Sequence, residues 1–184
     1  MLKKNMNINS KSFLLTGGVR SGKSTYALNL ANNRKNPYFI ATAWNGDNEM
    51  EKRIMKHKAE RGNEWTTIEE QLNISSAILK AAENNSDFII VDCIGAWITN
   101  IMIKHNIDEV NNVKEIKTFL DIINEINIPI AIVTNEVGMG LIPDNKMGRN
   151  FRDNIGFINK EIAYKVSNVI FMVSGLPMLL KGRL

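Results

Sequence analysis

The residues with the clearest chemical meaning lie in one short run, which matches the pattern G-x-x-x-x-G-K-[ST] in full. Its members, called the phosphate loop below, are Gly17, Gly18, Val19, Arg20, Ser21, Gly22, Lys23 and Ser24. Glycines in such a run let backbone N–H groups turn inward around a phosphate, and the N-terminus of the following helix adds a favourable dipole. We therefore expect Lys23 to reach the β- and γ-phosphates of a nucleoside triphosphate and the Ser24 hydroxyl to bind Mg²⁺.

A second candidate metal ligand is Asp92, which ends the run Phe88–Asp92 after four apolar residues. Such a run is typical of a Walker B strand, whose terminal carboxylate binds Mg²⁺ directly or through water. A buried strand with a polar end and no metal would look the same in sequence. The complete phosphate loop elsewhere in the chain favours the metal interpretation, so we expect Asp92 and Ser24 to share the ion.

His57 is the candidate nucleophile, in a segment that we expect to be a helix over Asp47–Arg61. Arg53 and Arg61 would lie one turn before and one turn after it, where their charges disfavour protonation of the imidazole. A neutral imidazole beside a triphosphate site is suited to attack phosphorus, and the arginines are suited to bind phosphate oxygens. From these residues alone, however, an exposed histidine on a charged helix is the preferred interpretation.

A glycine-containing loop over Asn135–Pro143 follows the apolar run Ile130–Thr134. In open α/β sheets, ligands bind beyond the carboxyl ends of the strands, so this loop should face the same site as the phosphate loop. Glu136 could then orient a hydroxyl group or a metal-bound water. The alternative is a plain connection between a strand and a helix.

These residues must be positioned by a fold in which short apolar runs alternate with longer amphipathic ones. That pattern is typical of an α/β domain with a mostly parallel central sheet flanked by helices. We expect strands over Ser12–Thr16, Tyr38–Thr42, Phe88–Asp92, Ile130–Thr134 and Val169–Val173. We expect helices over Lys23–Asn33, Asp47–Arg61, Asn73–Glu83, Ala96–His105, Asp108–Ile126 and Arg149–Val166. The length of 184 residues fits one catalytic domain over residues 12–184 after an N-terminal extension over residues 1–11.

Composition and charge exclude several classes of protein. Apolar residues make up 44% of the chain, which excludes intrinsic disorder. The net charge of +4 is spread along the chain, so we expect no nucleic-acid partner. A single cysteine, Cys93, cannot form an internal disulfide. The longest apolar stretch, Phe88–Ile103, is interrupted by Asp92 and Asn100, and no signal peptide precedes it, so we expect a cytoplasmic protein with no membrane span.

Several motifs recur together in one known family. They are the phosphate loop with Thr16, the run Ala41-Thr42-Ala43, the residues Glu49, Met50, Arg53, Ile54 and His57, the run Asn135–Gly140 with Pro143, the run Phe151–Asp153 with Gly156 and Asn159, and the run Val173–Pro177. Over residues 12–181 the sequence resembles the bifunctional adenosylcobinamide kinase / adenosylcobinamide-phosphate guanylyltransferase family of cobalamin biosynthesis. The resemblance implies a P-loop NTPase fold of the RecA-like type and a homotrimer.

The resemblance also implies two reactions. In the first, ATP or GTP phosphorylates the hydroxyl of the aminopropanol arm of adenosylcobinamide. In the second, GTP guanylylates a histidine with loss of pyrophosphate, and the substrate phosphate then takes the GMP group to give adenosylcobinamide-GDP. The histidine of the family pattern falls on His57, which reverses the preference stated above for an exposed, unreactive residue.

The family's remaining site residues are carried over by position. Besides the phosphate loop, the implied nucleotide contacts are Thr16, Ala41, Thr42, Ala43, Lys58, Ala59, Glu60, Arg61, Glu69 and Asp92. Arg53 and Glu136 are the candidates for contact with the second substrate. Two alternatives stay open: a P-loop kinase in which His57 is never modified, and a nucleotide-dependent switch protein that phosphorylates no small molecule.

Overall fold

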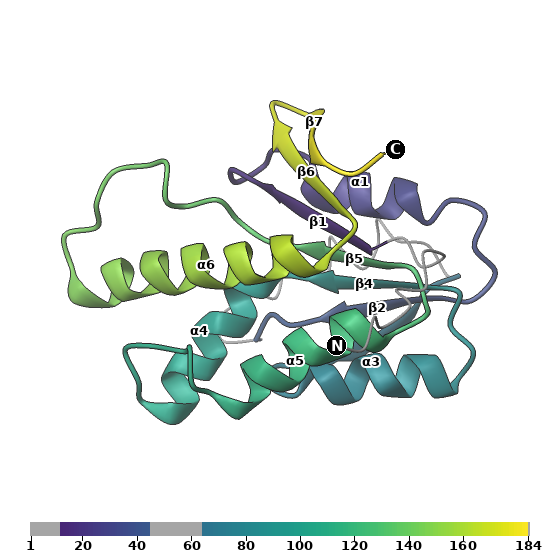
Figure 1. Cartoon of the computed structure of the whole chain (residues 1–184), viewed down its shortest axis with the longest axis horizontal. Coiled ribbons are helices and arrows are strands. Elements are labelled where there is room, and N and C mark those ends of the chain that lie inside the picture. The colour runs from purple at the N-terminus through teal and green to yellow at the C-terminus, as the bar shows by residue number, and fades with distance from the viewer. Residues whose placement is uncertain (1–11, 45–63, 184) are drawn as a thin grey trace, which may run out of the picture.

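The computed structural model describes residues 12–44 and 64–183, and its centre is a seven-stranded sheet in the order β3-β2-β4-β5-β1-β6-β7 (Figure 1). The strands are β1 (Ser12–Gly17), β2 (Pro37–Ala41), β3 (Thr66–Glu69), β4 (Phe88–Asp92), β5 (Ile130–Val133), β6 (Asn168–Val173) and β7 (Leu176–Lys181). Neighbouring strands from β3 to β6 are parallel, whereas β7 pairs with β6 in the antiparallel direction. The expected mostly parallel sheet is confirmed.

Helices cover both faces of this sheet (Figure 1). They are α1 (Lys23–Leu30), α3 (Ile74–Glu83), α4 (Ile94–His105), α5 (Lys114–Glu125) and α6 (Lys146–Lys165). The buried side chains of α3 to α6 share one apolar cluster with one face of the sheet, and those of α1 share a second cluster with the other face. Among the described helices, α1 is therefore the one that covers the second face of the sheet.

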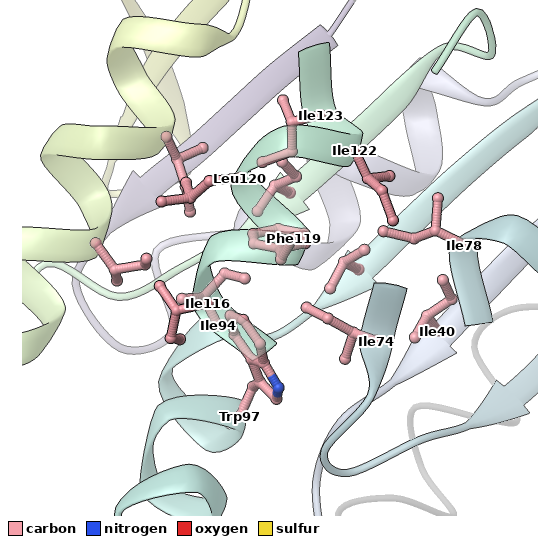
Figure 2. Packing of buried hydrophobic residues seen from close by; sticks show 14 of the residues in the cluster. Ile40, Ile74, Ile78, Ile94, Trp97, Ile116, Phe119, Leu120, Ile122 and Ile123 are labelled. Atoms are coloured by element: carbon pink, nitrogen blue, oxygen red, sulfur yellow. The ribbon is translucent and has the colours of Figure 1, made fainter. Parts of the chain in front are cut away.

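Alternation along the strands explains why both faces are apolar. Leu14 of β1 points into the cluster beneath α3 to α6, while Phe13 and Leu15 point into the cluster beneath α1. Strands buried on both faces appear in sequence as continuous apolar runs. In the larger cluster, shown in Figure 2, the rings of Trp97 and Phe119 meet edge to face with centroids 5.0 Å apart.

All five expected strands are confirmed, with ends that differ by at most one residue from the observed ones. Two strands, β3 and β7, were not expected. In β3 only Ile68 is even half-buried, and its other residues are polar. Strand β7 is a short apolar run that is exposed along its whole length and contains Pro177, a residue that is unusual inside a strand. In the part of the chain that the structure describes, no helix is long and apolar enough to cross a membrane, and the apolar stretch 88–103 divides between β4 and α4.

The expected helix over Asp108–Ile126 begins too early, because the observed helix α5 starts at Lys114. The side chain of Asn154 holds the preceding segment in an irregular conformation: its Oδ1 accepts from the Val110 N–H at 3.2 Å and its Nδ2 donates to the Asp108 carbonyl at 2.8 Å. The Val110 side chain is fully buried in the core, which also holds this segment in place. Two smaller corrections are that α1 ends at Leu30 rather than Asn33, and that α6 starts at Lys146 rather than Arg149.

Candidate active site

The site lies at the edge of the sheet where the carboxyl ends of the parallel strands meet. Ala41 at the end of β2 lies opposite Glu69 of β3 on one side and opposite Asp92 of β4 on the other. Asp92 in turn lies opposite Val133 of β5, and β5 lies beside β1, which leads into the phosphate loop. The register therefore brings Glu69, Ala41, Asp92 and the phosphate loop to one edge, as expected for ligand binding in an open α/β sheet.

The phosphate loop needs glycine at its first position. Gly17 has a φ of 141°, and a Cβ there would collide with the carbonyl oxygen of Met172 in β6. Gly22 has a φ of 91° and immediately precedes α1, where glycine tolerates the left-handed conformation. The turn between β6 and β7 supports the loop from outside, because the Gly175 N–H donates to the Ser21 carbonyl at 3.1 Å.

The ammonium group of Lys23 lies inside this loop. Its Nζ donates to the Gly17 carbonyl at 3.0 Å and to the Gly18 carbonyl at 2.6 Å. Burial lowers the pKa of Lys23 from its ordinary value, and the negative charge of Asp92 acts in the opposite direction. The backbone thus holds a buried cation directly beneath the turn that is shaped to surround a phosphate.

Ser24 and Asp92 meet as the sequence predicts. The Ser24 hydroxyl donates to Oδ2 of Asp92 at 2.6 Å, which joins the first turn of α1 to the end of β4. A hydroxyl and a carboxylate are hard oxygen ligands of the kind that Mg²⁺ prefers, usually with water and substrate phosphates completing the shell. Among the described residues there is no group of three or more His, Cys, Asp or Glu side chains that could hold a metal ion.

Thr42 fixes the backbone beyond Asp92. Its hydroxyl donates to the Cys93 carbonyl at 2.7 Å and accepts from the Cys93 N–H at 2.8 Å. Thr42 is fully buried, and its own carbonyl accepts from Nδ2 of Asn100 in α4 at 2.9 Å. The sequence assigned Thr42 only by resemblance. Its two hydrogen bonds to Cys93 were not predicted, because the two residues are far apart in the chain.

Cys93 is the N-cap of α4, where its sulfur accepts from the Ala96 N–H at 3.5 Å. Burial, with a smaller contribution from the charge of Asp92, raises the pKa of Cys93 to about 11. The thiol is therefore neutral at physiological pH, and a neutral thiol is a poor nucleophile. The only cysteine of the chain caps a helix beside the site and is unsuited to attack phosphorus.

The loop after β5 reaches the phosphate loop, as its place after a strand predicts. The Glu136 N–H donates to the Gly17 carbonyl at 3.0 Å, so this carbonyl serves Glu136 and Lys23 together. The Glu136 carboxylate accepts from the Gly138 N–H at 2.7 Å, and the Arg152 guanidinium of α6 donates to the Gly138 carbonyl at 2.5 Å. The loop that connects β5 to α6 is therefore hydrogen-bonded to the first residue of the phosphate loop, and a role for Glu136 in the reaction stays a prediction.

Other predicted residues divide into two groups. Glu69 is exposed at the end of β3, and Thr16 is buried at the end of β1 with its Oγ1 lacking a hydrogen-bond partner among the described residues. The second group lies outside the described residues and comprises Arg53, His57, Lys58, Ala59, Glu60 and Arg61, with the whole expected helix Asp47–Arg61.

Sequence relatives support one family. The family model described as "Cobinamide kinase / cobinamide phosphate guanyltransferase" matches residues 13–180. A bifunctional adenosylcobalamin biosynthesis protein, CobP of Pseudomonas aeruginosa, is 36% identical over 170 residues, covering 92% of this chain and 96% of the relative. The bifunctional adenosylcobalamin biosynthesis protein CobU of Salmonella typhimurium is 34% identical over 181 residues, covering 91% of this chain and 98% of the relative.

Solved structures are similar in fold at much lower identity. The assembled ATPase EscN of the type III secretion system of enteropathogenic E. coli has a TM-score of 0.59 at 10% identity, covering 90% of this chain and 43% of that chain. The RadB recombinase has a TM-score of 0.50 at 15% identity, covering 94% of this chain and 81% of that chain. This likeness concerns the fold alone, which is that of a RecA-like P-loop NTPase.

Proposed function

Because this chain belongs to the cobinamide kinase / cobinamide phosphate guanyltransferase family, we propose that His57 carries GMP between its two substrates. The protein is an adenosylcobinamide kinase and adenosylcobinamide-phosphate guanylyltransferase of cobalamin biosynthesis. In the kinase reaction, the γ-phosphoryl group of ATP or GTP passes to the hydroxyl of the aminopropanol arm. In the second reaction, a His57 nitrogen attacks the α-phosphorus of GTP and pyrophosphate leaves. The substrate phosphate then attacks the adduct and releases His57.

The observation that carries the nucleotide half of this proposal is the meeting of three side chains at the phosphate loop. Lys23 lies on the Gly17 and Gly18 carbonyls, and Ser24 and Asp92 are joined at 2.6 Å. Lys23 would stabilise the charge on the transferring group. Ser24 and Asp92 are the residues that would hold Mg²⁺, which would neutralise phosphate charge.

The role of His57 is supported by the resemblance and by the charges beside it in sequence. Arg53 and Arg61 flank it at helical spacing, so a neutral imidazole is favoured if the segment is helical. A covalent intermediate divides one difficult displacement into two easier ones. Cys93, a nucleophile of another type, is less suited to this role, because it caps α4 and burial raises its pKa to about 11.

Glu136 is the residue that we propose to orient the corrinoid hydroxyl. Its backbone is hydrogen-bonded to Gly17 at 3.0 Å, so its place next to the phosphate loop is fixed by the main chain. The side chain is half-buried and accepts a hydrogen bond from the Gly138 N–H. Such a carboxylate can accept a hydrogen bond from a substrate hydroxyl that approaches the γ-phosphate.

We further propose that the enzyme is a homotrimer, as the resemblance implies. The support within the chain is the edge strand β7, where Leu176 is 72% exposed, Leu180 is 60% exposed and Met178 is 55% exposed. Large exposed apolar side chains on an edge strand are typical of a surface that another protein covers. A second copy of the chain is the partner that the family resemblance supplies.

Intact-protein mass spectrometry after incubation with GTP and Mg²⁺ tests the histidine step. We expect an acid-labile mass increase of one GMP in the wild type and none in His57→Ala, which should still phosphorylate adenosylcobinamide. The matched control is His105→Ala, since His105 lies at the end of α4 and bonds to Glu115 at 3.0 Å. This control should keep the adduct.

The other outcomes each identify an alternative. An adduct that persists in His57→Ala would assign the nucleophile to another residue. No adduct in the wild type, with corrinoid phosphorylation intact, would leave the kinase-only enzyme as the function. Tight triphosphate binding with neither activity would favour the nucleotide-dependent switch protein.

A further inference from the structure

We propose that Asn159 of α6 is a positioning residue for phosphoryl transfer, acting through the loop that follows β5. The inference rests on the kinase half of the proposed function and goes beyond it, because the side-chain hydrogen bonds of Asn159 go to Thr134 and Asn135 after β5. It concerns how the fold holds Glu136 and the Gly17 carbonyl in their working positions.

Both polar atoms of the Asn159 side chain are engaged with the end of β5. Its Oδ1 accepts from the Thr134 hydroxyl at 2.7 Å, and its Nδ2 donates to the Asn135 carbonyl at 3.1 Å. Thr134 is fully buried, so its hydroxyl cannot turn to water if this partner is lost. A carboxylate could replace the acceptor but not the donor, so the position requires an amide.

The residues held by Asn159 continue directly into the site. The Thr134 N–H donates to the Leu15 carbonyl at 2.9 Å and the Glu136 N–H donates to the Gly17 carbonyl at 3.0 Å. These two bonds extend the pairing between β5 and β1 beyond the end of β5. The orientation of the Gly17 carbonyl therefore depends on where the loop after β5 is held.

Helix α6 holds this loop on the other side of Glu136 as well. Arg152 donates to the Gly138 carbonyl at 2.5 Å, and the Gly138 N–H donates to the Glu136 carboxylate at 2.7 Å. Arg152 and Asn159 are two helical turns apart, so they lie on the same face of α6. One face of α6 thus fixes the loop on both sides of Glu136, the residue proposed to orient the substrate hydroxyl.

The consequence for chemistry follows from the shared carbonyl. When a triphosphate binds, Lys23 must exchange the Gly17 and Gly18 carbonyls for phosphate oxygens. If the loop after β5 shifts, the Gly17 carbonyl loses the hydrogen bond from the Glu136 N–H. The carbonyl then binds the Lys23 ammonium group more strongly, and this group moves less readily to the phosphate. The Glu136 carboxylate shifts at the same time, and small misplacements of reacting groups are costly.

The test compares Asn159→Ala with Asn154→Ala. Asn154 is the control because it is a buried amide on the same helix whose side chain also joins two backbone groups, the Val110 N–H and the Asp108 carbonyl, away from the phosphate loop. Its Nδ2 makes a further, weaker contact with the Met102 sulfur at 3.4 Å. We expect Asn159→Ala to lower kcat by about 30-fold with the nucleotide KM changed less than about threefold. Asn154→Ala should lose similar thermal stability and keep kcat within about twofold. Equal kcat in the two variants would overturn the inference.

Thr134 tests the same bond from the opposite side. Thr134→Ser keeps the hydroxyl and should keep kcat within about twofold, whereas Thr134→Val removes it and should reproduce much of the Asn159→Ala loss. A Thr134→Val enzyme with wild-type kcat would overturn the inference. Each enzyme is assayed for transfer to adenosylcobinamide and for basal transfer to water. Wild-type hydrolysis without corrinoid phosphorylation would overturn the kinase proposal, while the effect of Asn159→Ala on hydrolysis would still decide the role of Asn159.

Discussion

The carboxyl edge of the sheet and the β6–β7 hairpin are neighbours, yet the first buries polar side chains and the second exposes apolar ones. At the carboxyl edge, Lys23 and Thr42 are buried and their polar atoms are paired. In β7, apolar side chains such as Leu176 and Leu180 are exposed. The Gly175–Ser21 hydrogen bond joins the two regions at 3.1 Å. The residues at the carboxyl edge are therefore paired within the chain, whereas the apolar side chains of β7 are suited to be covered by another protein surface.

The position of each region in the sheet explains the difference. Strand β1 has parallel neighbours on both sides, β5 and β6, whereas β7 pairs among the described strands with β6 alone. The hairpin is nevertheless well anchored, because Nζ of Lys181 donates to the carbonyls of Ala163 at 2.8 Å and Val166 at 2.7 Å at the end of α6. A cation at a helix C-terminus is favourable for the helix dipole. Exposure of β7 is thus not a result of weak attachment.

The largest expected effect concerns the carboxyl edge. Lys23→Ala should lower kcat for phosphoryl transfer by about 10²–10³-fold, because a preorganised cation is removed from the developing charge. Steady-state kinetics with a thermal melt would check this, and Lys35→Ala, at an exposed position away from the loop, is the control. A loss below tenfold would mean that Lys23 only supports the conformation of the loop. The burial of polar groups at the carboxyl edge would then serve the fold and not the reaction.

An intermediate effect concerns burial at the same edge. The unfolded thiol of Cys93 loses its proton near pH 9.0, whereas the folded one keeps it until about pH 11. Between these values the unfolded state alone is stabilised by deprotonation, so the free energy of unfolding falls as pH rises, by up to about 1.4 kcal/mol per pH unit. Below pH 9 this group contributes no pH dependence.

Urea unfolding of wild type and Cys93→Ala at pH 8 and at pH 10.5 isolates this contribution. The wild type should lose more stability between the two pH values than the variant, since other titrating groups are common to both. Identical losses would show that the thiol is solvated, and the carboxyl edge would then be less closed than the hydrogen bonds indicate.

The smallest effect on the folded chain concerns the hairpin. Leu180→Glu should change the free energy of unfolding of the chain by less than about 0.5 kcal/mol, because the side chain is exposed. The same change should dissociate the proposed homotrimer, which sedimentation velocity would detect. Tyr164→Glu is the control, since Tyr164 is 75% exposed on α6 outside the hairpin. A Leu180→Glu protein that still sediments as a trimer would remove β7 from the interface.

Sequence reasoning succeeded where the information is local. The phosphate loop and the strand ending in Asp92 are contiguous patterns, and the structure brings Ser24 and Asp92 together at 2.6 Å. Their binding of Mg²⁺ stays a prediction. The place of Glu136 followed from the rule that loops after parallel strands share one edge. The function came from motifs spread over the chain, and the family match over residues 13–180 confirms it.

Sequence reasoning failed where the cause lies in tertiary structure. The predicted helix over Asp108–Ile126 ignored Asn154, which belongs to another helix and holds residues 108–110 out of helical form. The hydrogen bonds of Thr42 and of Asn159 join residues that no spacing rule connects. The edge strand β7 was missed because its short apolar run contains Pro177, and proline is found in strands mainly at sheet edges. The role of His57 stays a prediction.

The order of strands in the sheet also determines when the site can form during synthesis. Strand β1 is made first, but its partners come late: Ser12 lies opposite Ile130, and Phe13 lies opposite Asn168. Until β5 and β6 have left the ribosome, the apolar side chains of β1 have no strand beside them, which is a hazard of parallel sheets with distant partners. Nucleotide affinity should therefore arise abruptly, near the completion of the chain, and a bound triphosphate would mark a protein that has finished folding.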